Sequence, residues 1–130
     1  MGDKKIYLVV EDDPVTARLF ERFSTLWGYE SIVATEGTAE QLNATNMPAV
    51  VQLDGLDGRC FDLHDKLIRS NPHACYILVS SNGMYSDLAE QRGIHYFYKS
   101  PQLNYNEIRE FIESQTRQHA ETTEPDEIKI

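Results

Sequence analysis

The stretch IYLVVEDDPVTARLF, residues 6–20, joins a strand to a helix through three consecutive acidic residues. Its first five residues, Ile6–Val10, form a continuous apolar run of strand length, which is typical of a strand buried on both faces. Asp13 and Pro14 then predict a helix start, because aspartate caps free N–H groups and proline fits the first helical turn. The stretch therefore predicts a buried strand that passes directly into a helix.

The helix after Pro14 carries apolar residues at helical spacing, and Gly28 predicts its end. We expect one apolar stripe to pack against a sheet. The stripe consists of Val15, Leu19, Phe23 and Leu26, broadened by Phe20 and Trp27.

Strand and helix alternate along the rest of the chain. Apolar runs predict four further strands at residues 29–34, 49–53, 75–79 and 95–98. Helices are expected from a Thr38–Gln41 capping box, over residues 62–70, from Ser86 to Gly93, and after an Asn104–Glu107 capping pair. Five strand–helix units in alternation predict an α/β fold, a doubly wound parallel five-stranded sheet in a three-layer sandwich.

The chain has 130 residues, 41% of them hydrophobic, which suits one domain with one ordinary core. Its formal net charge is -9, so neither a nucleic acid nor an anionic membrane surface is expected as a partner. Residues 120–130 are polar, acidic and contain a proline, which predicts a disordered tail after a domain at residues 1–119.

No apolar run approaches the ~20 residues that span a bilayer and no export signal is visible, so we expect a cytoplasmic protein. Cys60 and Cys75 are isolated, which is typical of reduced structural thiols. His73 lies near Cys75, but four ligands at finger-like spacing are missing, so zinc is a remote alternative.

Chemically functional side chains follow four of the five predicted strands, at the point where each strand ends. They are Glu11, Asp12 and Asp13 after the first strand, Asp54 after the third, Ser80 and Ser81 after the fourth, and Lys99 after the fifth. The carboxyl ends of parallel strands meet at one edge of the sheet, which is where open α/β sheets bind ligands. We therefore expect these side chains to lie together.

Carboxylates gathered at one edge repel one another, and a hard divalent cation relieves that repulsion. Mg²⁺ keeps several waters, so two or three carboxylates and a carbonyl are enough to bind it. A hydroxyl and an ammonium beside them bind phosphoryl oxygens, and a carboxylate nucleophile gives an aspartyl phosphate. Taken alone, each residue is an ordinary cap, turn, loop or surface residue, so the interpretation depends on their shared position.

Four segments resemble response-regulator receiver domains, the CheY-like phosphoacceptors of bacterial two-component signalling. The segments are IYLVVEDDPVTARLF, PAVVQLD, CYILVSS and YFYKS. The resemblance covers roughly residues 4–116 and implies the flavodoxin-like (βα)5 fold.

The resemblance also implies a set of metal ligands. Asp12 is expected to contact Mg²⁺ directly and Glu11 through water. Asp54 and the backbone carbonyl of Leu56 complete the protein ligands. Asp13 is then expected to be the helix cap rather than a ligand.

The same resemblance makes Asp54 the phosphoacceptor. Ser80 holds the hydroxyl that is expected to move onto a phosphoryl oxygen, and Lys99 pairs with the carboxylate or the phosphoryl group. Tyr96 stands at the family's aromatic switch position and is expected to turn inward into the space that Ser80 leaves.

The sequence departs from the receiver pattern around the third and fourth helices. Gly58 stands where the family has proline, Asp62 where it has glycine, and Ser100 separates Lys99 from Pro101. The spacings from Asp54 to Ser80 and from Ser80 to Lys99 are short, which predicts trimmed third and fourth helix regions. The isomers of the Lys99–Ser100 and Ser100–Pro101 peptide bonds stay open.

The resemblance implies a stand-alone receiver that takes its phosphoryl group from a histidine kinase or a phosphotransfer protein and signals by contact with an unidentified protein. It would catalyse its own phosphorylation and dephosphorylation without being a conventional enzyme. A monomer and a homodimer paired through the first or fifth helix both stay open. Two alternatives remain: a degenerate receiver that binds partners without phosphorylation, and a magnesium-dependent phosphatase or other α/β hydrolase using Asp54, for which no cap is available.

Overall fold

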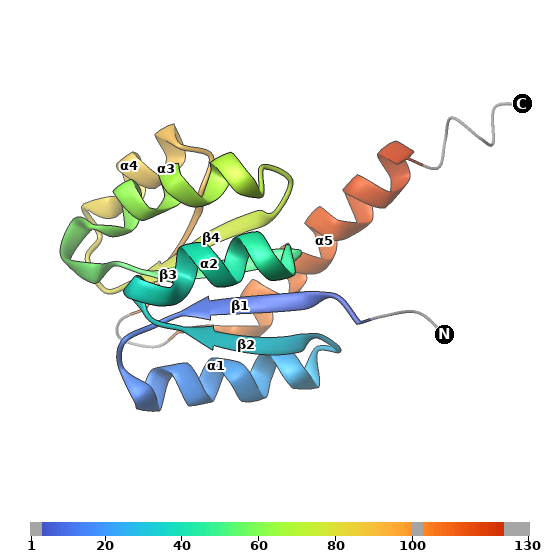
Figure 1. The fold of residues 1–130 in the computed structure, drawn as a ribbon, viewed down its shortest axis with the longest axis horizontal. Coiled ribbons are helices and arrows are strands. Elements are labelled where there is room, and N and C mark those ends of the chain that lie inside the picture. Colours follow the sequence, from blue (N-terminus) through green and yellow to red (C-terminus); the bar gives the residue numbers. More distant parts are fainter. Residues whose placement is uncertain (1–3, 100–102, 124–130) are drawn as a thin grey trace, which may run out of the picture.

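The computed structural model describes residues 4–99 and 103–123, and within them five parallel strands form one sheet in the order β2-β1-β3-β4-β5 (Figure 1). The strands are β1 Ile6–Val10, β2 Glu30–Ala34, β3 Val50–Asp54, β4 Cys75–Ser80 and β5 His95–Tyr98. The helices are α1 Pro14–Leu26, α2 Glu36–Asn46, α3 Cys60–Ser70, α4 Tyr85–Gln91 and α5 Tyr105–Thr123, with a 3₁₀ turn, η1, at Leu56–Gly58. The prediction of a doubly wound α/β sheet is confirmed.

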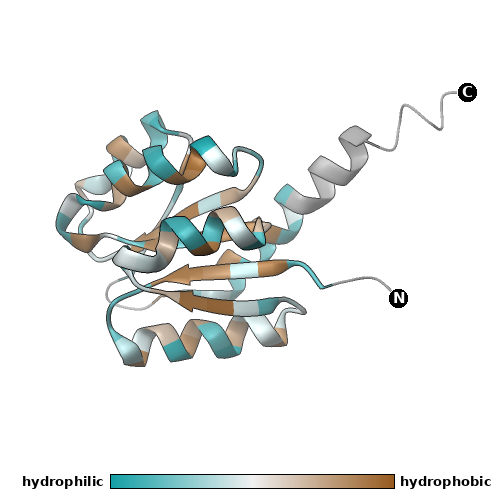
Figure 2. Ribbon diagram, in the orientation of Figure 1, coloured by the Kyte–Doolittle hydropathy of each residue, from teal (hydrophilic) through white to brown (hydrophobic). Residues whose placement is uncertain are grey.

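The sheet is buried on both faces because its strands send alternate side chains into two apolar clusters. In β1, Leu8 and Val10 join the cluster that α2, α3 and α4 cover, whereas Tyr7 and Val9 join the cluster that α1 and α5 cover. Figure 1 shows α2, α3 and α4 on one side of the sheet and α1 on the other. Colouring by hydropathy shows apolar strands enclosed between these helices (Figure 2). The sheet is therefore the middle layer of three.

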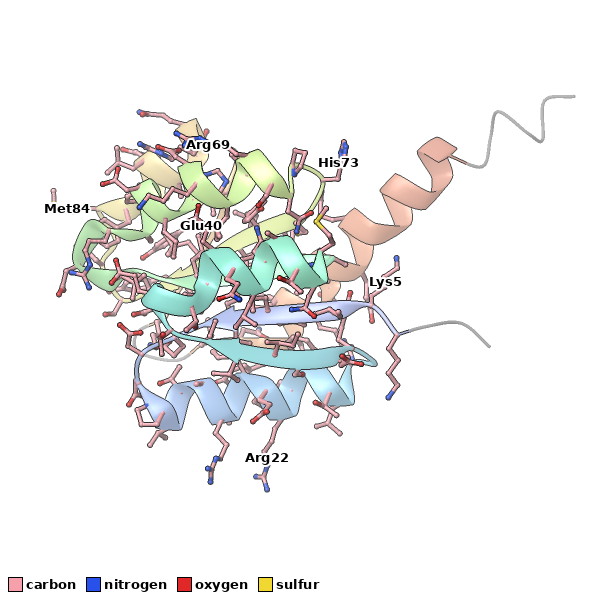
Figure 3. The ribbon with its side chains drawn as sticks, viewed as in Figure 1. Lys5, Arg22, Glu40, Arg69, His73 and Met84 are labelled. Atoms are coloured by element: carbon pink, nitrogen blue, oxygen red, sulfur yellow. The ribbon has the colours of Figure 1, made fainter. Side chains whose placement is uncertain are left out.

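The buried face of α1 differs from the predicted stripe. Val15 and Leu26 are 76% and 79% exposed, and Leu19 is exposed as well. Phe20, which the prediction counted as broadening the stripe, is buried against the sheet, and Arg22 points away from it (Figure 3). Apolar side chains cover a broad arc of this helix, from Val15 to Phe20, so spacing alone did not determine which part of the arc faces the sheet. The face with the large Phe20 ring forms the core because it buries the greater apolar area.

Three helices begin earlier than predicted. The capping box of α2 is formed by Thr35 and Thr38 rather than by Thr38 and Gln41, since the N–H of Thr35 donates to Thr38 Oγ1 at 3.0 Å. The first residue of α3 is Cys60, and Ser86 lies inside α4 instead of capping it. Side-chain patterns locate a helix well and its first residue less well, because loop hydrogen bonds also contribute to the start.

Other boundaries agree with the prediction. Asp13 caps α1 by accepting hydrogen bonds from the N–H of Thr16 at 3.1 Å and from its hydroxyl at 2.6 Å. Asn104 Oδ1 accepts from the N–H of Glu107 at 3.2 Å at the start of α5. Helix α4 has 7 residues, in line with the expected shortening. Helix α5 runs to Thr123, past the predicted domain end at residue 119. The rest of the predicted tail, 124–130, and the Ser100–Pro101 bond lie outside the described residues.

Candidate functional site

The predicted ligands and reactive residues meet in a cleft of about 440 Å³ at the carboxyl edge of the sheet. The strand register explains this, because Val10 pairs with Leu53 and Asp54 pairs with Val79, which places the strand ends side by side. The lining residues are Glu11, Asp12, Asp13, Asp54, Gly55, Leu56, Asp57, Arg59, Ser80, Ser81, Asn82, Tyr85 and Lys99.

Lys99 lies between two acidic side chains of this cleft. Its Nζ is 4.0 Å from Glu11 Oε1 and 4.0 Å from Asp54 Oδ1. Its backbone N–H donates to the carbonyl of Ser80 at 2.9 Å, which continues the pairing of β4 with β5. The backbone therefore fixes where the ammonium enters the cleft, and the ammonium offsets part of the repulsion between the two carboxylates.

The side chain of Glu11 is buried, with 6% of the residue exposed. Burial, and after it the negative charge of Asp54, raises the pKa of Glu11 to about 7, although Lys99 and a hydrogen bond from the N–H of Asp13 act against this rise. Without further positive charge, Glu11 and Asp54 are therefore not both fully ionised at neutral pH. The cleft is short of positive charge where the two carboxylates face each other.

Asp12 and Asp13 are both exposed, but their carboxylates accept different hydrogen bonds. The hydrogen bonds from Thr16 lower the pKa of the Asp13 carboxyl and keep this side chain at the start of α1. Asp12 Oδ1 accepts a long hydrogen bond of 3.4 Å from the N–H of Glu36. Asp12 is therefore the more available of the two for a ligand.

The donor atoms for the expected cation are all oxygens. Among the residues that the structure describes, no group of three His, Cys, Asp or Glu side chains is close enough to hold a metal ion by itself. Mg²⁺ does not need such a cage, because it keeps several waters and binds through one or two carboxylates. The carbonyl of Leu56 already accepts a hydrogen bond from the N–H of Arg59 at 3.0 Å, which leaves it one lone pair. Glu11, Asp12 and Asp54, around a cleft short of positive charge, fit a hydrated Mg²⁺.

The hydroxyl of Ser80 accepts a hydrogen bond from the N–H of Asn82 at 3.1 Å, within the loop between β4 and α4. The half-buried Tyr96 donates its hydroxyl to two carbonyls of the same loop, that of Ser80 at 2.9 Å and that of Asn82 at 2.8 Å. A movement of the Ser80 hydroxyl toward Asp54 would break its bond to Asn82, a residue whose carbonyl also accepts from Tyr96. The two predicted switch residues are therefore physically linked.

The loop after Asp54 turns in the left-handed conformation. Leu56 and Asp57 have φ angles of 52° and 54°, and Gly58 follows with 91°. A non-glycine residue pays roughly 1–2 kcal/mol for this conformation, which burial of the Leu56 side chain offsets. Proline cannot adopt a positive φ, so the glycine at position 58 suits this turn where the family's proline would not.

Arg59 and Tyr85 line the cleft without having been predicted there. Arg59 Nε lies 2.9 Å from Glu36 Oε2 in an exposed ion pair that joins the start of α2 to the start of α3. The sequence signal for Tyr85 is indirect: Gly55 and Gly58 leave room for a ring, but nothing in the sequence says which ring occupies it.

The two cysteines are free, and burial raises the pKa of both the Cys60 and the Cys75 thiol to about 11. Both are therefore protonated and weakly reactive at neutral pH. Within the described part of the chain, no helix is both long and apolar enough to cross a membrane.

Comparison with solved structures finds CheY-like receiver domains. A response regulator receiver domain from Methanospirillum hungatei JF-1 aligns with 89% of this chain and 99% of its own, at 20% identity and a TM-score of 0.75. The signal receiver domain of a putative Luxo repressor protein from Vibrio parahaemolyticus aligns with 89% of this chain and 92% of its own, at 18% identity and a TM-score of 0.73. A receiver domain from Methylobacillus flagellatus covers 87% of this chain and 99% of its own, at 18% identity and a TM-score of 0.70.

Comparisons with protein-family models and with curated proteins give no match. The structural likeness therefore concerns the arrangement of the chain rather than its sequence. Strand order, helix placement and coverage of nearly the whole chain agree with these receivers. The chain thus has the flavodoxin-like (βα)5 fold of CheY-like response regulator receiver domains.

Proposed function

We propose that this protein is a response-regulator receiver that accepts a phosphoryl group on Asp54 in a Mg²⁺-dependent reaction. The observation that carries the proposal is the position of Lys99, whose ammonium is 4.0 Å from both Asp54 and Glu11 while its backbone binds Ser80. A nucleophilic carboxylate, a cation and a hydroxyl in one cleft are the groups that phosphoryl transfer to a carboxylate needs.

In the proposed reaction an oxygen of Asp54 attacks the phosphorus of the donor in line, and the bond between phosphorus and the donor's leaving atom breaks. Lys99 offsets the charge on the transferring oxygens. Glu11, Asp12, Asp54 and the carbonyl of Leu56 would hold Mg²⁺, which supplies further charge neutralisation there. The product is an aspartyl phosphate, so the step is a self-catalysed signalling event rather than turnover of a substrate.

The aspartyl phosphate adds nearly two negative charges to the cleft. Ser80 brings a hydroxyl from the end of β4 into the cleft, and it donates to a phosphoryl oxygen after leaving the N–H of Asn82. Tyr96 then loses the loop geometry that holds its hydroxyl and turns inward. The surface around α4 and β5 changes, and this change is the proposed signal.

The proposed phosphoryl donor is a histidine kinase or a phosphotransfer protein, which places the reaction in the cytoplasm. Output takes place through contact with another protein. Val15, Leu19 and Leu26 give α1 an exposed apolar face, which suits a protein contact. Whether the protein acts as a monomer or as a homodimer is independent of this chemistry.

The rival function is a degenerate receiver that binds partners without phosphorylation. The observations in its favour are the left-handed turn at Leu56 and Asp57 and the hydrogen bond that occupies the Leu56 carbonyl. Against it, a purely structural cleft has no use for a buried Glu11 beside Asp54, because their mutual repulsion destabilises the fold.

Intact-mass spectrometry after incubation with acetyl phosphate tests the proposal, with and without Mg²⁺. The wild type is expected to gain one phosphoryl group only when Mg²⁺ is present, and Asp54→Asn is expected to gain none. Asp57→Asn is the matched control, because Asp57 lines the same cleft with a 97% exposed side chain and has no assigned role. Absence of the adduct together with absence of Mg²⁺ binding would favour the degenerate receiver.

A further inference from the structure

Tyr85, the first residue of α4, lines the cleft that contains Asp54. A Cβ atom placed on Gly55 would lie 3.0 Å from Tyr85 Cε2 and 3.0 Å from Ser80 Oγ. A Cβ placed on Gly58 would lie 3.5 Å from the Tyr85 hydroxyl oxygen. The tyrosine ring therefore lies across the backbone that follows Asp54, from Gly55 to Gly58, and next to the hydroxyl of Ser80.

Two contacts fix the ring in this position. The ring of Phe61 in α3 meets it edge to face, with centroids 5.5 Å apart and an interplanar angle of 88°. The N–H of Tyr85 donates to the carbonyl of Asn82 at 3.2 Å, which ties the start of α4 to the loop after Ser80. Phe61 of α3 thus packs against the ring, the β4–α4 loop holds the backbone of Tyr85, and the side chain is half-buried against the apolar cluster.

We propose that Tyr85 is a positioning residue that shields the phosphoryl group on Asp54 from water and so sets the lifetime of the phosphorylated state. This inference rests on the function proposed above. Tyr85 is neither an expected metal ligand nor one of the two expected switch residues, Ser80 and Tyr96. Through it, α4 would affect the rate at which the phosphoryl group is lost.

The reaction that Tyr85 retards is hydrolysis of the aspartyl phosphate. A water oxygen attacks phosphorus, the bond between phosphorus and the Asp54 oxygen breaks, and the carboxylate is restored. Inorganic phosphate leaves with the water oxygen and both of its protons, as dihydrogen phosphate. The attacking water needs an approach to phosphorus and hydrogen-bonding partners along it. An aromatic face over Gly55 offers no such partner and removes the volume that the water would occupy.

The lifetime is measured by loading the protein with acetyl phosphate and Mg²⁺, removing the donor by desalting, and following loss of the phosphoryl adduct by intact mass. Tyr85→Ala is expected to lose the adduct on the order of tenfold faster than the wild type. Tyr85→Phe is expected to match the wild type, because it keeps the ring and lacks only the hydroxyl. Met84→Ala is the matched control, since Met84 is the neighbouring residue, is 84% exposed and does not line the cleft.

Decay is followed only on molecules that have already been phosphorylated, so a variant that merely folds less well loads less but decays at the wild-type rate. If Tyr85→Ala does not fold, Tyr85→Leu takes its place, with faster decay again expected. Equal decay rates for the wild type and the variant without the ring would overturn the role of Tyr85 while leaving the phosphoacceptor function intact. A wild type that never acquires the adduct would overturn both.

Discussion

The ammonium nitrogen of Lys99 lies 4.0 Å from Oδ1 of Asp54, and the same nitrogen lies 4.0 Å from Oε1 of Glu11. One cation therefore offsets part of the repulsion between two neighbouring carboxylates. The backbone of Lys99 is fixed by its hydrogen bond to Ser80, so the charge is delivered by the end of β5 rather than by a flexible loop. The ammonium of Lys99 and the hydroxyl-bearing residue Ser80 are therefore joined through the backbone at the edge of the sheet where Asp54 lies.

Lys99→Met removes the charge and keeps most of the apolar length of the side chain. We expect the initial rate of phosphorylation by acetyl phosphate to fall by about tenfold or more, because the transferring oxygens lose one preorganised cation. Rates come from intact-mass time courses at fixed Mg²⁺, with a melting curve to show that the variant is folded. An unchanged phosphorylation rate would show that the charge of Lys99 does not contribute to the reaction.

Gly55→Ala is expected to destabilise the fold by about 1–3 kcal/mol, because the added methyl group meets Ser80 Oγ and Tyr85 Cε2 at 3.0 Å. Gly37→Ala is the opposite case. It lies in the first turn of α2 with no atom within 4 Å of the added carbon, so a gain of about 0.5 kcal/mol is expected. Urea denaturation of both variants measures the difference, and equal effects would contradict the packing described around Gly55.

Phe20→Ala tests which face of α1 packs on the sheet. Phe20 is 1% exposed, and removal of its ring is expected to cost about 3–5 kcal/mol of unfolding free energy. Val15→Ala on the outer face is expected to change stability by no more than about 0.5 kcal/mol. Chemical denaturation of the two variants measures both losses of stability. A large loss for Val15→Ala with a small one for Phe20→Ala would contradict the packing of α1 described above.

His64 is expected to make stability depend on pH. Its side chain is 4% exposed, and burial lowers its pKa below the ordinary value, with Asp65 acting in the opposite direction. The unfolded chain therefore takes up this proton at a higher pH than the folded chain, so the contribution of His64 is present above about pH 6.5 and is lost as pH falls below it.

The matched variant for this test is His64→Phe, which keeps an aromatic ring against Tyr76 but cannot titrate. Unfolding free energies of both proteins are compared between about pH 7 and about pH 5. The wild type is expected to lose more stability over this range than the variant. Parallel curves would show that His64 is not the group responsible.

The strands and the site could be predicted from the sequence because both follow from short-range patterns. Apolar runs such as Ile6–Val10 identify strands buried on both faces, and parallel strands necessarily bring their carboxyl ends together. Asp54, Ser80 and Lys99 each follow such a run, so their proximity needs no knowledge of side-chain packing. Their chemical roles remain predictions until the phosphoryl group is observed.

The remaining features depend on packing that no local pattern encodes. The predicted stripe of α1 included Phe20, which is buried, and also Val15 and Leu26, which are exposed, because packing against the sheet selects one part of a broad apolar arc. The left-handed turn at Leu56 and Asp57 is a tertiary effect, since aspartate tolerates a positive φ but leucine does not favour it. The position of Tyr85 near Gly55 depends on how the start of α4 packs against the loop after β3, far away in the sequence.

The central claim is that Asp54 carries the phosphoryl group, and its most direct test is to locate that group chemically. Sodium borohydride reduces an aspartyl phosphate to homoserine, which remains through proteolysis and peptide mass spectrometry. After incubation with acetyl phosphate and Mg²⁺, we predict homoserine at position 54 and unmodified aspartate at positions 12, 13 and 57. Homoserine at another position, or at none of them despite bound Mg²⁺ and a folded protein, would contradict the account.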